Sequence, residues 1–150
     1  MSQLKFIRDK RSPMPKSTAV SKAMSSNKPK NTIPELLLRK ALWQINLRGY
    51  RIHSKLIEGR PDIVYPKLKI AIFVNGCFWH RCPNCKLPLP KHNREFWKEK
   101  FNKNILRDKK VYKQLKKEGW SVLIIWECQI KSDLTKVLSG IKNAINISKT

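Results

Sequence analysis

The sequence predicts an α/β fold in which helices flank a mixed β-sheet. Two apolar runs, residues 70–74 (IAIFV) and 121–126 (SVLIIW), have the length and composition of buried strands. Segments with apolar residues at every third or fourth position lie before, between and after them, as expected for helices that cover a sheet. The predicted order is helix, strand hairpin, helix, strand and helix, within one domain.

The composition indicates a polyanionic partner. The 150 residues include 33 Lys and Arg but only 10 Asp and Glu, which gives a formal charge of +23. Such an excess repels itself in a compact chain, so nucleic acid is the first candidate partner; a ribosomal or membrane-surface role competes with it. The N-terminus does not resemble a secretory signal, and no apolar run approaches the roughly 20 residues of a membrane span. We expect a cytoplasmic protein with no membrane partner.

Residues 1–31 are predicted to form a flexible basic arm ahead of a single domain, residues 32–150. The arm is rich in Ser, Lys and Pro and shows no apolar periodicity. Counterion release could order it on a phosphate backbone, or it could stay a solvated tail.

The first helix is predicted to begin at Thr32. Residues 32–35 (TIPE) fit a capping box, in which the Glu35 carboxylate accepts a hydrogen bond from the backbone N–H of Thr32. Gly49 is expected to end the helix. The apolar residues at helical spacing between them are Leu37, Leu38, Ala41, Leu42 and Ile45. Capping alone would explain Glu35.

A strand hairpin is predicted to place a carboxylate beside the end of a core strand. After a short strand within residues 50–56 and a turn at 58–61, residues 62–65 (DIVY) and 70–74 would pair antiparallel. Asp62 would then lie near Asn75 and His80. A lone carboxylate there is more often a turn or cap residue, but this position makes Asp62 a site candidate. Asn75 and Gly76 are expected to end the strand, because both tolerate positive φ.

Four cysteines predict a structural zinc site. Cys77, Cys82 and Cys85 follow one apolar strand and Cys128 follows the other, so neighbouring strands would bring them together. Zinc takes four thiolate or imidazole ligands in closed structural sites. Free thiols or a disulfide are the alternatives, and His80 could replace one cysteine. We favour four sulfurs, which leaves His80 free for chemistry.

The C-terminal half is predicted to contain two more helices. The first would span residues 93–118, with Asn93 as its cap and Gly119 at its end, and Asp108 interrupts its apolar side. Asp108 is either a solvated or salt-bridged residue or a site carboxylate. Ser132 would cap the last helix. The apolar residues of that helix are Leu134, Val137, Leu138, Ile141, Ala144 and Ile145.

Several motifs together resemble the very-short-patch repair (Vsr) DNA mismatch endonucleases over about residues 20–142. The matching motifs are TxPE at 32–35, GRPD at 59–62, GCFWH at 76–80, EFW at 95–97, Asn104 with RD at 107–108, GW at 119–120 and WEC at 126–128. The resemblance implies a restriction-endonuclease-like core that nicks one strand beside the thymine of a T:G mismatch. Such mismatches arise when 5-methylcytosine deaminates, so the resemblance implies a functional association with a DNA cytosine methyltransferase. It also implies a bacterial enzyme that acts on the nucleoid, and we expect a monomer.

The resemblance also implies roles for individual residues. Asp62 and the main-chain carbonyl of Val74 would hold Mg²⁺, which prefers oxygen ligands. His80 would assist the attacking water or stabilise the leaving group, Asp108 would support the site, and Glu35 matches a helix-borne site carboxylate. The residues matching those that insert into or wedge open the duplex are Met24, Phe78, Trp79 and Trp97. The cysteines Cys77, Cys82, Cys85 and Cys128 match a zinc-ligand pattern.

One departure concerns the end of the core strand. This chain has Val74-Asn75 where well-known members of the family have Thr-His. A second proton carrier or phosphate contact is lost, and Asn75 is either a site residue in its place or a turn residue. Two other functions compete with mismatch nicking: a restriction-type nuclease of the same core acting on matched DNA, and a non-catalytic basic zinc protein that binds nucleic acid.

Overall fold

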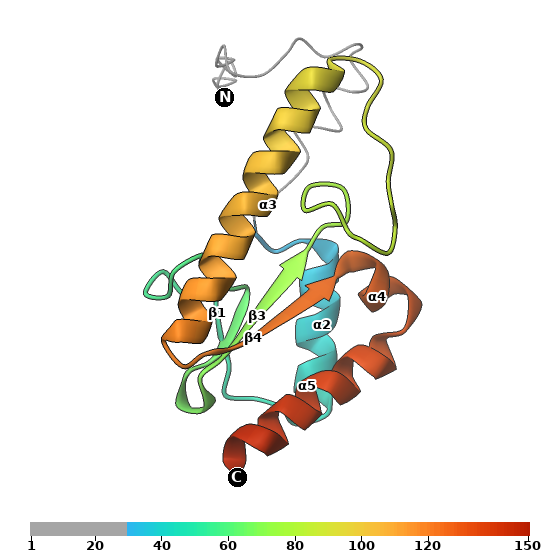
Figure 1. The fold of residues 1–150 in the computed structure, drawn as a ribbon. Coiled ribbons are helices and arrows are strands. Elements are labelled where there is room, and N and C mark those ends of the chain that lie inside the picture. Colours follow the sequence, from blue (N-terminus) through green and yellow to red (C-terminus); the bar gives the residue numbers. More distant parts are fainter. Residues whose placement is uncertain (1–29) are drawn as a thin grey trace, which may run out of the picture.

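A computed structural model describes residues 30–150, so most of the predicted arm, including Met24, lies outside the described residues. Its elements are α2 (Ile33–Gln44), β1 (Arg51–Ile52), β2 (Ile63–Tyr65), the 3-10 turn η1 (Pro66–Leu68), β3 (Ile70–Asn75), α3 (Arg94–Lys117), β4 (Ser121–Trp126), α4 (Glu127–Ser132) and α5 (Leu134–Lys149). The predicted order of elements is confirmed, and α4 is an addition to it (Figure 1).

The sheet is mixed, as predicted. Its strand order is β1-β2-β3-β4; β1 and β2 run antiparallel, as do β2 and β3, whereas β3 and β4 are parallel. The β3–β4 connection contains α3, in keeping with the long crossover that parallel strands require. Asn75 pairs with Trp126 at the ends of β3 and β4, so the chain leaves both strands at the same edge of the sheet.

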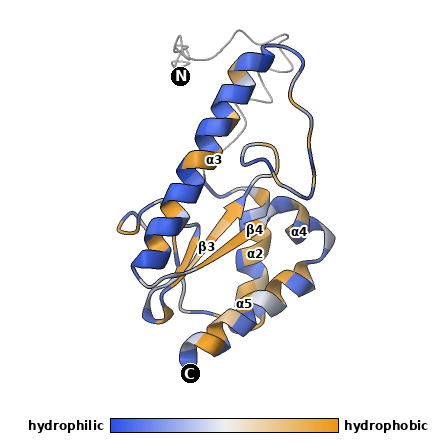
Figure 2. Cartoon of the chain, viewed as in Figure 1, coloured by the Kyte–Doolittle hydropathy of each residue, from blue (hydrophilic) through white to orange (hydrophobic). Residues whose placement is uncertain are grey.

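The alternation of β3 side chains creates two cores. Ile70 and Ile72 belong to a cluster with α2 and α5 residues, including Leu38 and Ile141. Ala71 and Phe73 belong to a second cluster with Leu115 of α3, together with partly buried side chains around it. The sheet therefore lies between α3 on one face and α2 with α5 on the other (Figure 1), and its central strands are hydrophobic along their length (Figure 2).

Several predicted boundaries are wrong. Helix α2 ends at Gln44, because Asn46 adopts a left-handed conformation with φ of 63°; Gly49 lies beyond the helix end. Leu37 and Ile45 are 43% and 42% exposed, so the buried stripe is narrower than predicted. Strand β1 has only two residues.

Two further corrections concern the ends of β3 and the start of α5. Asn75 is the last residue of β3 and is not a turn residue, and neither it nor Gly76 has a positive φ. Asp133, not Ser132, caps α5: its side chain accepts a hydrogen bond from the Lys136 N–H, while Ser132 ends α4. Within residues 30–150, no helix is long and apolar enough to cross a membrane.

Candidate active site and metal centre

Asp62 lies against the main chain of β3, as the hairpin predicted. The pairing of β2 with β3 brings Asp62 beside Val74, whose backbone N–H donates a hydrogen bond to Asp62 Oδ2 over 2.7 Å. This bond fixes the carboxylate next to the Val74 peptide. Asp62 and Val74, the two residues predicted to hold a cation, are therefore neighbours near the end of β3.

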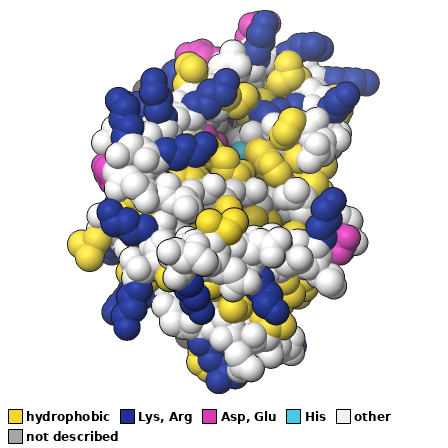
Figure 3. All heavy atoms as spheres, turned by 60° about the horizontal axis from the view of Figure 1, so that its bottom comes forward, with side chains coloured by type: hydrophobic (Ala, Val, Ile, Leu, Met, Phe, Trp, Pro, Cys, Tyr) yellow, Lys and Arg dark blue, Asp and Glu magenta, His cyan; other side chains and the backbone are white. Residues whose placement is uncertain are grey.

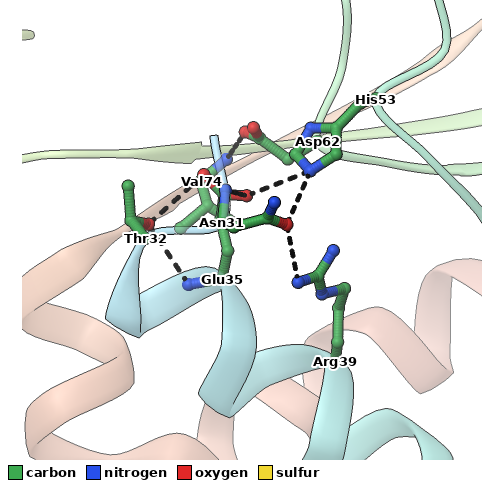
Figure 4. A network of polar contacts seen from close by, with 7 residues as sticks. All are labelled: Asn31, Thr32, Glu35, Arg39, His53, Asp62 and Val74. Atoms are coloured by element: carbon green, nitrogen blue, oxygen red, sulfur yellow. Dashed lines mark hydrogen bonds and ion pairs between the residues drawn. The ribbon is translucent and has the colours of Figure 1, made fainter. Parts of the chain in front are cut away.

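Glu35 caps α2 and also faces Asp62 (Figure 4). Its carboxylate accepts hydrogen bonds from the Asn31 backbone N–H (3.0 Å) and the Thr32 hydroxyl (3.2 Å). The predicted hydrogen bond from the Thr32 N–H is therefore wrong: the backbone donor is Asn31, the residue before the N-cap. Glu35 is only 3% exposed. Its two roles, cap and neighbour of Asp62, are compatible.

His53 joins these two carboxylates, and the sequence analysis missed it. Glu35, His53 and Asp62 offer potential ligand atoms that all lie within 4.8 Å of one another. His53 follows β1, and its backbone N–H donates to the Asp62 carbonyl over 3.3 Å. The missing signal was the register of the first strand: once Ile52 pairs with Ile63, His53 must lie opposite Asp62.

Burial perturbs Asp62 most strongly. Burial, together with the adjacent Glu35, raises the pKa of Asp62 to about 7, although the hydrogen bond from Val74 and the interaction with His80 act in the opposite direction. The groups around Asp62 therefore do not offset the cost of burying its negative charge. A bound cation would stabilise the ionised carboxylate.

His80 is held by Asp108. Its Nδ1 lies 2.6 Å from Asp108 Oδ2, and both side chains are partly buried. When Nδ1–H donates to Asp108, Nε2 is left as the free proton acceptor. Among residues 30–150, Asp108 pairs with His80 and with no Lys or Arg, although α3 is rich in both.

Three residues along one side of α3 position the site. Asn104, Asp108 and Tyr112 are one helical turn apart, so their side chains share a face. The Asn104 amide donates to the Trp79 carbonyl over 3.1 Å, and Asp108 binds the next residue, His80. Tyr112 accepts a hydrogen bond from the Asn75 amide over 2.9 Å. Helix α3 therefore fixes both the end of β3 and the loop after it.

The Asn75–Tyr112 contact gives Asn75 a structural explanation. Asn75 is 4% exposed. Burial raises the pKa of Tyr112 to about 12, the Asn75 bond lowers it, and the charges of Asp108 and Asp62 raise it. The pair thus lies within electrostatic reach of both site carboxylates. A direct role of Asn75 in the chemistry stays a prediction.

Beside His80 lies an aromatic cluster, which consists of Phe78, Trp79, Phe96, Trp97 and Phe101. Contacting ring centroids in it are 5.1–5.8 Å apart. Trp97 and Phe101 are buried, whereas Phe78 and Trp79 are half-buried above them. The Lys100 ammonium lies 5.4 Å from the Trp79 ring centre, and the Arg81 guanidinium lies 4.4 Å from that of Phe101. Trp97 therefore supports the rings that solvent can reach.

The four cysteines form one cluster, as predicted. Cys77, Cys82, Cys85 and Cys128 bring their sulfurs within 4.8 Å of one another, and all four thiols are free. Cys82 Sγ and Cys128 Sγ are 3.8 Å apart, which matches the roughly 3.8 Å expected between two sulfurs each bound about 2.3 Å from a tetrahedral zinc ion. His80 is engaged elsewhere. The donor set and its spacing suit a structural zinc ion.

Comparisons with known proteins identify the family of the chain. A family model described as DNA mismatch endonuclease Vsr matches residues 14–86. The type II nicking enzyme V.NmeDIP of Neisseria meningitidis serogroup C is 43% identical over 125 residues, which cover 83% of this chain and 84% of that protein. The chain belongs to the Vsr family of DNA endonucleases.

Two further relatives have a similar identity over stretches of different length. The type II nicking enzyme V.HpaIIP of Haemophilus parainfluenzae is 39% identical over 122 residues, covering 81% of this chain and 86% of the relative. The DNA mismatch endonuclease Vsr of Escherichia coli (strain K12) is 39% identical over 83 residues, covering 55% of this chain and 53% of the relative. The chain is therefore an endonuclease whose substrate is DNA.

Proposed function

We propose that this Vsr-family endonuclease nicks one strand of duplex DNA at T:G mismatches. The observation that carries the proposal is the convergence of a carboxylate pair, a His80–Asp108 pair and an aromatic cluster where β3 ends. The carboxylate pair and the His80–Asp108 pair suit hydrolysis of a phosphodiester, and the aromatic cluster suits distortion of a duplex. A non-catalytic DNA-binding protein would need none of the carboxylate contacts.

Mg²⁺ would be held by Asp62 and the Val74 carbonyl, with Glu35 beside them. When bound, Mg²⁺ stabilises charge on the phosphoryl oxygens and makes a bound water more acidic. His80 Nε2 would accept or return a proton at the reacting oxygen, since Nδ1 is engaged by Asp108. Asp108 would also stabilise the imidazolium that follows proton uptake.

The half-buried rings of Phe78 and Trp79 would engage the mismatched step. A mismatched pair costs less to unstack than a matched one, and stacking on an aromatic ring offsets part of that cost. The rings adjoin His80 in sequence and rest on buried Trp97. Distortion of the duplex would therefore place the scissile phosphate next to His80.

The basic surface would supply the phosphate contacts. On the face shown in Figure 3, Lys and Arg greatly outnumber Asp and Glu, and a hollow exposes a His and an acidic side chain among hydrophobic groups. On α3, a shallow hollow is lined by Lys109, Tyr112, Lys113, Lys116 and Lys117. We also propose that the arm, residues 1–31, contacts DNA through Met24. We further propose that the enzyme acts as a monomer.

A second candidate function is nicking of matched DNA within a restriction system. It is favoured by the names of the relatives V.NmeDIP and V.HpaIIP, which are type II nicking enzymes. The same carboxylates and His80–Asp108 pair would perform this reaction. The two candidate functions differ in whether the substrate must contain a mispaired base. Only the mismatch function depends on a cytosine methyltransferase, whose product 5-methylcytosine deaminates to give the T:G pair.

Strand nicking on paired substrates tests both candidates. Duplexes that differ only in one T:G or C:G pair, set in several flanking sequences, would be incubated with the protein and Mg²⁺. We expect nicking at T:G, none at C:G, and none with Asp62→Asn; Glu99→Gln, a change at an exposed residue of α3, is the control. Equal nicking of both duplexes would favour the restriction-type function. Binding without nicking of any duplex would contradict both.

A further inference from the structure

We propose that His53 is a third ligand of the cation site formed by Asp62 and Glu35, and that this nitrogen shifts the site's preference from Mg²⁺ toward Mn²⁺. The inference deepens the proposed function, on which it rests for the placement of the cation at Asp62. His53 was not among the residues that the sequence motifs implicate. It enters through the sheet, because its backbone pairs with that of Asp62.

The distances suit shared coordination better than direct hydrogen bonding. His53 Nε2 lies 3.7 Å from Glu35 Oε2, which is too long for a hydrogen bond. Two ligands that each lie about 2.0–2.2 Å from one cation can be separated by up to about 4.4 Å. The three ligand atoms of Glu35, His53 and Asp62 lie within 4.8 Å of one another, so small side-chain adjustments bring them to a common ion.

The surroundings of His53 hold its ring at the cluster (Figure 4). Asn31 Oδ1 lies 3.2 Å from His53 Nε2 and also accepts a hydrogen bond from Arg39 over 2.9 Å. The Asn31 backbone N–H binds Glu35 as well. Asn31 therefore links the histidine, the buried carboxylate and a fixed guanidinium. Without a cation, these contacts hold the imidazole beside the carboxylates. A cation bound by Nε2 would replace the contact of this nitrogen with Asn31 Oδ1, because one ring nitrogen does not donate a proton and coordinate a metal at the same time.

The donor set decides which cation is preferred. Mg²⁺ binds oxygen ligands and keeps several waters, whereas imidazole nitrogen favours transition metals. Mn²⁺ accepts carboxylate and carbonyl oxygens too, so it can use Asp62, Glu35 and His53 together. Removing the imidazole should thus weaken Mn²⁺ binding much more than Mg²⁺ binding.

Cation binding to the zinc-loaded full chain, without DNA, tests the proposal. Free Mn²⁺ would be followed by electron paramagnetic resonance, and Mg²⁺ would be measured by competition with Mn²⁺. We expect His53→Gln to weaken Mn²⁺ binding about tenfold or more and Mg²⁺ binding far less. His92→Gln, the same change at an exposed histidine before α3, should bind as wild type does, and Asp62→Asn should lose both cations.

A second variant guards against loss of folding. His53→Asp keeps a ligand but exchanges nitrogen for oxygen, so the ratio of Mn²⁺ to Mg²⁺ affinity should fall while zinc content and the melting temperature stay as in wild type. Unchanged Mn²⁺ affinity in His53→Gln, an unchanged affinity ratio in folded His53→Asp, or a wild type that takes up no Mn²⁺ would overturn the proposal. Because no DNA is present, these outcomes are separate from failure to nick a mismatch.

Discussion

His80 Nδ1 lies 2.6 Å from Asp108 Oδ2, across 28 positions of sequence. The contact joins the loop after β3 to the middle of α3. One turn earlier on that helix, Asn104 binds the carbonyl of Trp79. Two consecutive loop residues are thus held by two residues spaced one helical turn apart, which makes the position of the imidazole depend on α3.

Asp108→Asn should lower the rate of nicking about 100-fold or more while leaving DNA affinity close to that of wild type. The amide can still contact His80, but it does not stabilise the imidazolium or fix the same ring tautomer. Single-turnover nicking measures the effect. His80→Ala combined with Asp108→Asn should be no slower than His80→Ala alone; additive losses would mean that Asp108 acts independently of His80.

Tyr112→Phe should cost about 1–3 kcal/mol of unfolding free energy and should also slow nicking, because the buried Asn75 amide loses its acceptor at the site. Tyr65→Phe is the matched control: it removes a 2.8 Å bond to the Leu47 carbonyl on the other side of the sheet. Urea unfolding and nicking rates would be compared. Equal slowing in both variants would show that lost stability, and not the Asn75 contact, limits activity.

Trp79→Ala should reduce nicking of a T:G duplex about 10- to 100-fold, since stacking of one base on an aromatic ring contributes about 1–3 kcal/mol. Trp43→Ala removes another tryptophan, 54% exposed on α2 and remote from the aromatic cluster in sequence. It should nick as wild type does. If Trp79→Ala keeps full activity and full preference for T:G, the wedge role of this ring is excluded.

Metal analysis should find about one zinc ion per chain, as expected for a closed four-cysteine site. Removing it with a chelator, or changing Cys85 to Ser, should lower the melting temperature and abolish nicking, because zinc binding and folding are coupled. Cobalt substitution would report tetrahedral thiolate coordination by its visible absorption. Full activity of a zinc-free chain would contradict the structural role.

Stability without added divalent cations should fall as the pH rises toward 7. Asp62 has a pKa of about 7 in the folded protein against 3.8 for the ordinary group, so between these values the folded state binds more protons than the unfolded state. Asp62 therefore contributes at most about 1.4 kcal/mol per pH unit to the slope of the unfolding free energy against pH. Its contribution favours the folded state at the lower pH. Asp62→Asn should lose this component. Parallel pH profiles for both proteins would contradict the shift.

The sequence was sufficient to predict which site residues lie next to the ends of the core strands. Asp62, Val74, the four cysteines and His80 could be placed because apolar runs such as residues 70–74 mark where the strands end. The role of α3 was harder to predict. From the residues alone, a solvated or salt-bridged Asp108 was the default, and the family resemblance implied only that it supports the site. The path of the loop in three dimensions shows that it faces His80.

His53 and Asn75 could not be interpreted from sequence for different physical reasons. His53 depends on the register of a two-residue strand, and so short a segment carries no periodicity from which to read its pairing. Asn75 resembles a turn residue beside Gly76, but pairing with β4 continues through it and its amide finds Tyr112. In both cases a partner distant in sequence overrides the local pattern.

The cysteine cluster also sets the order in which a working enzyme can be assembled. The backbone N–H of Cys128 contacts the sulfur of Cys77, 51 positions earlier, so the loop that carries His80 is anchored by a residue synthesised much later. A nascent chain, or one terminated before residue 128, has the reactive loop without its last anchor and without the end of β4. We therefore expect chains that end before residue 128 to be unable to nick DNA.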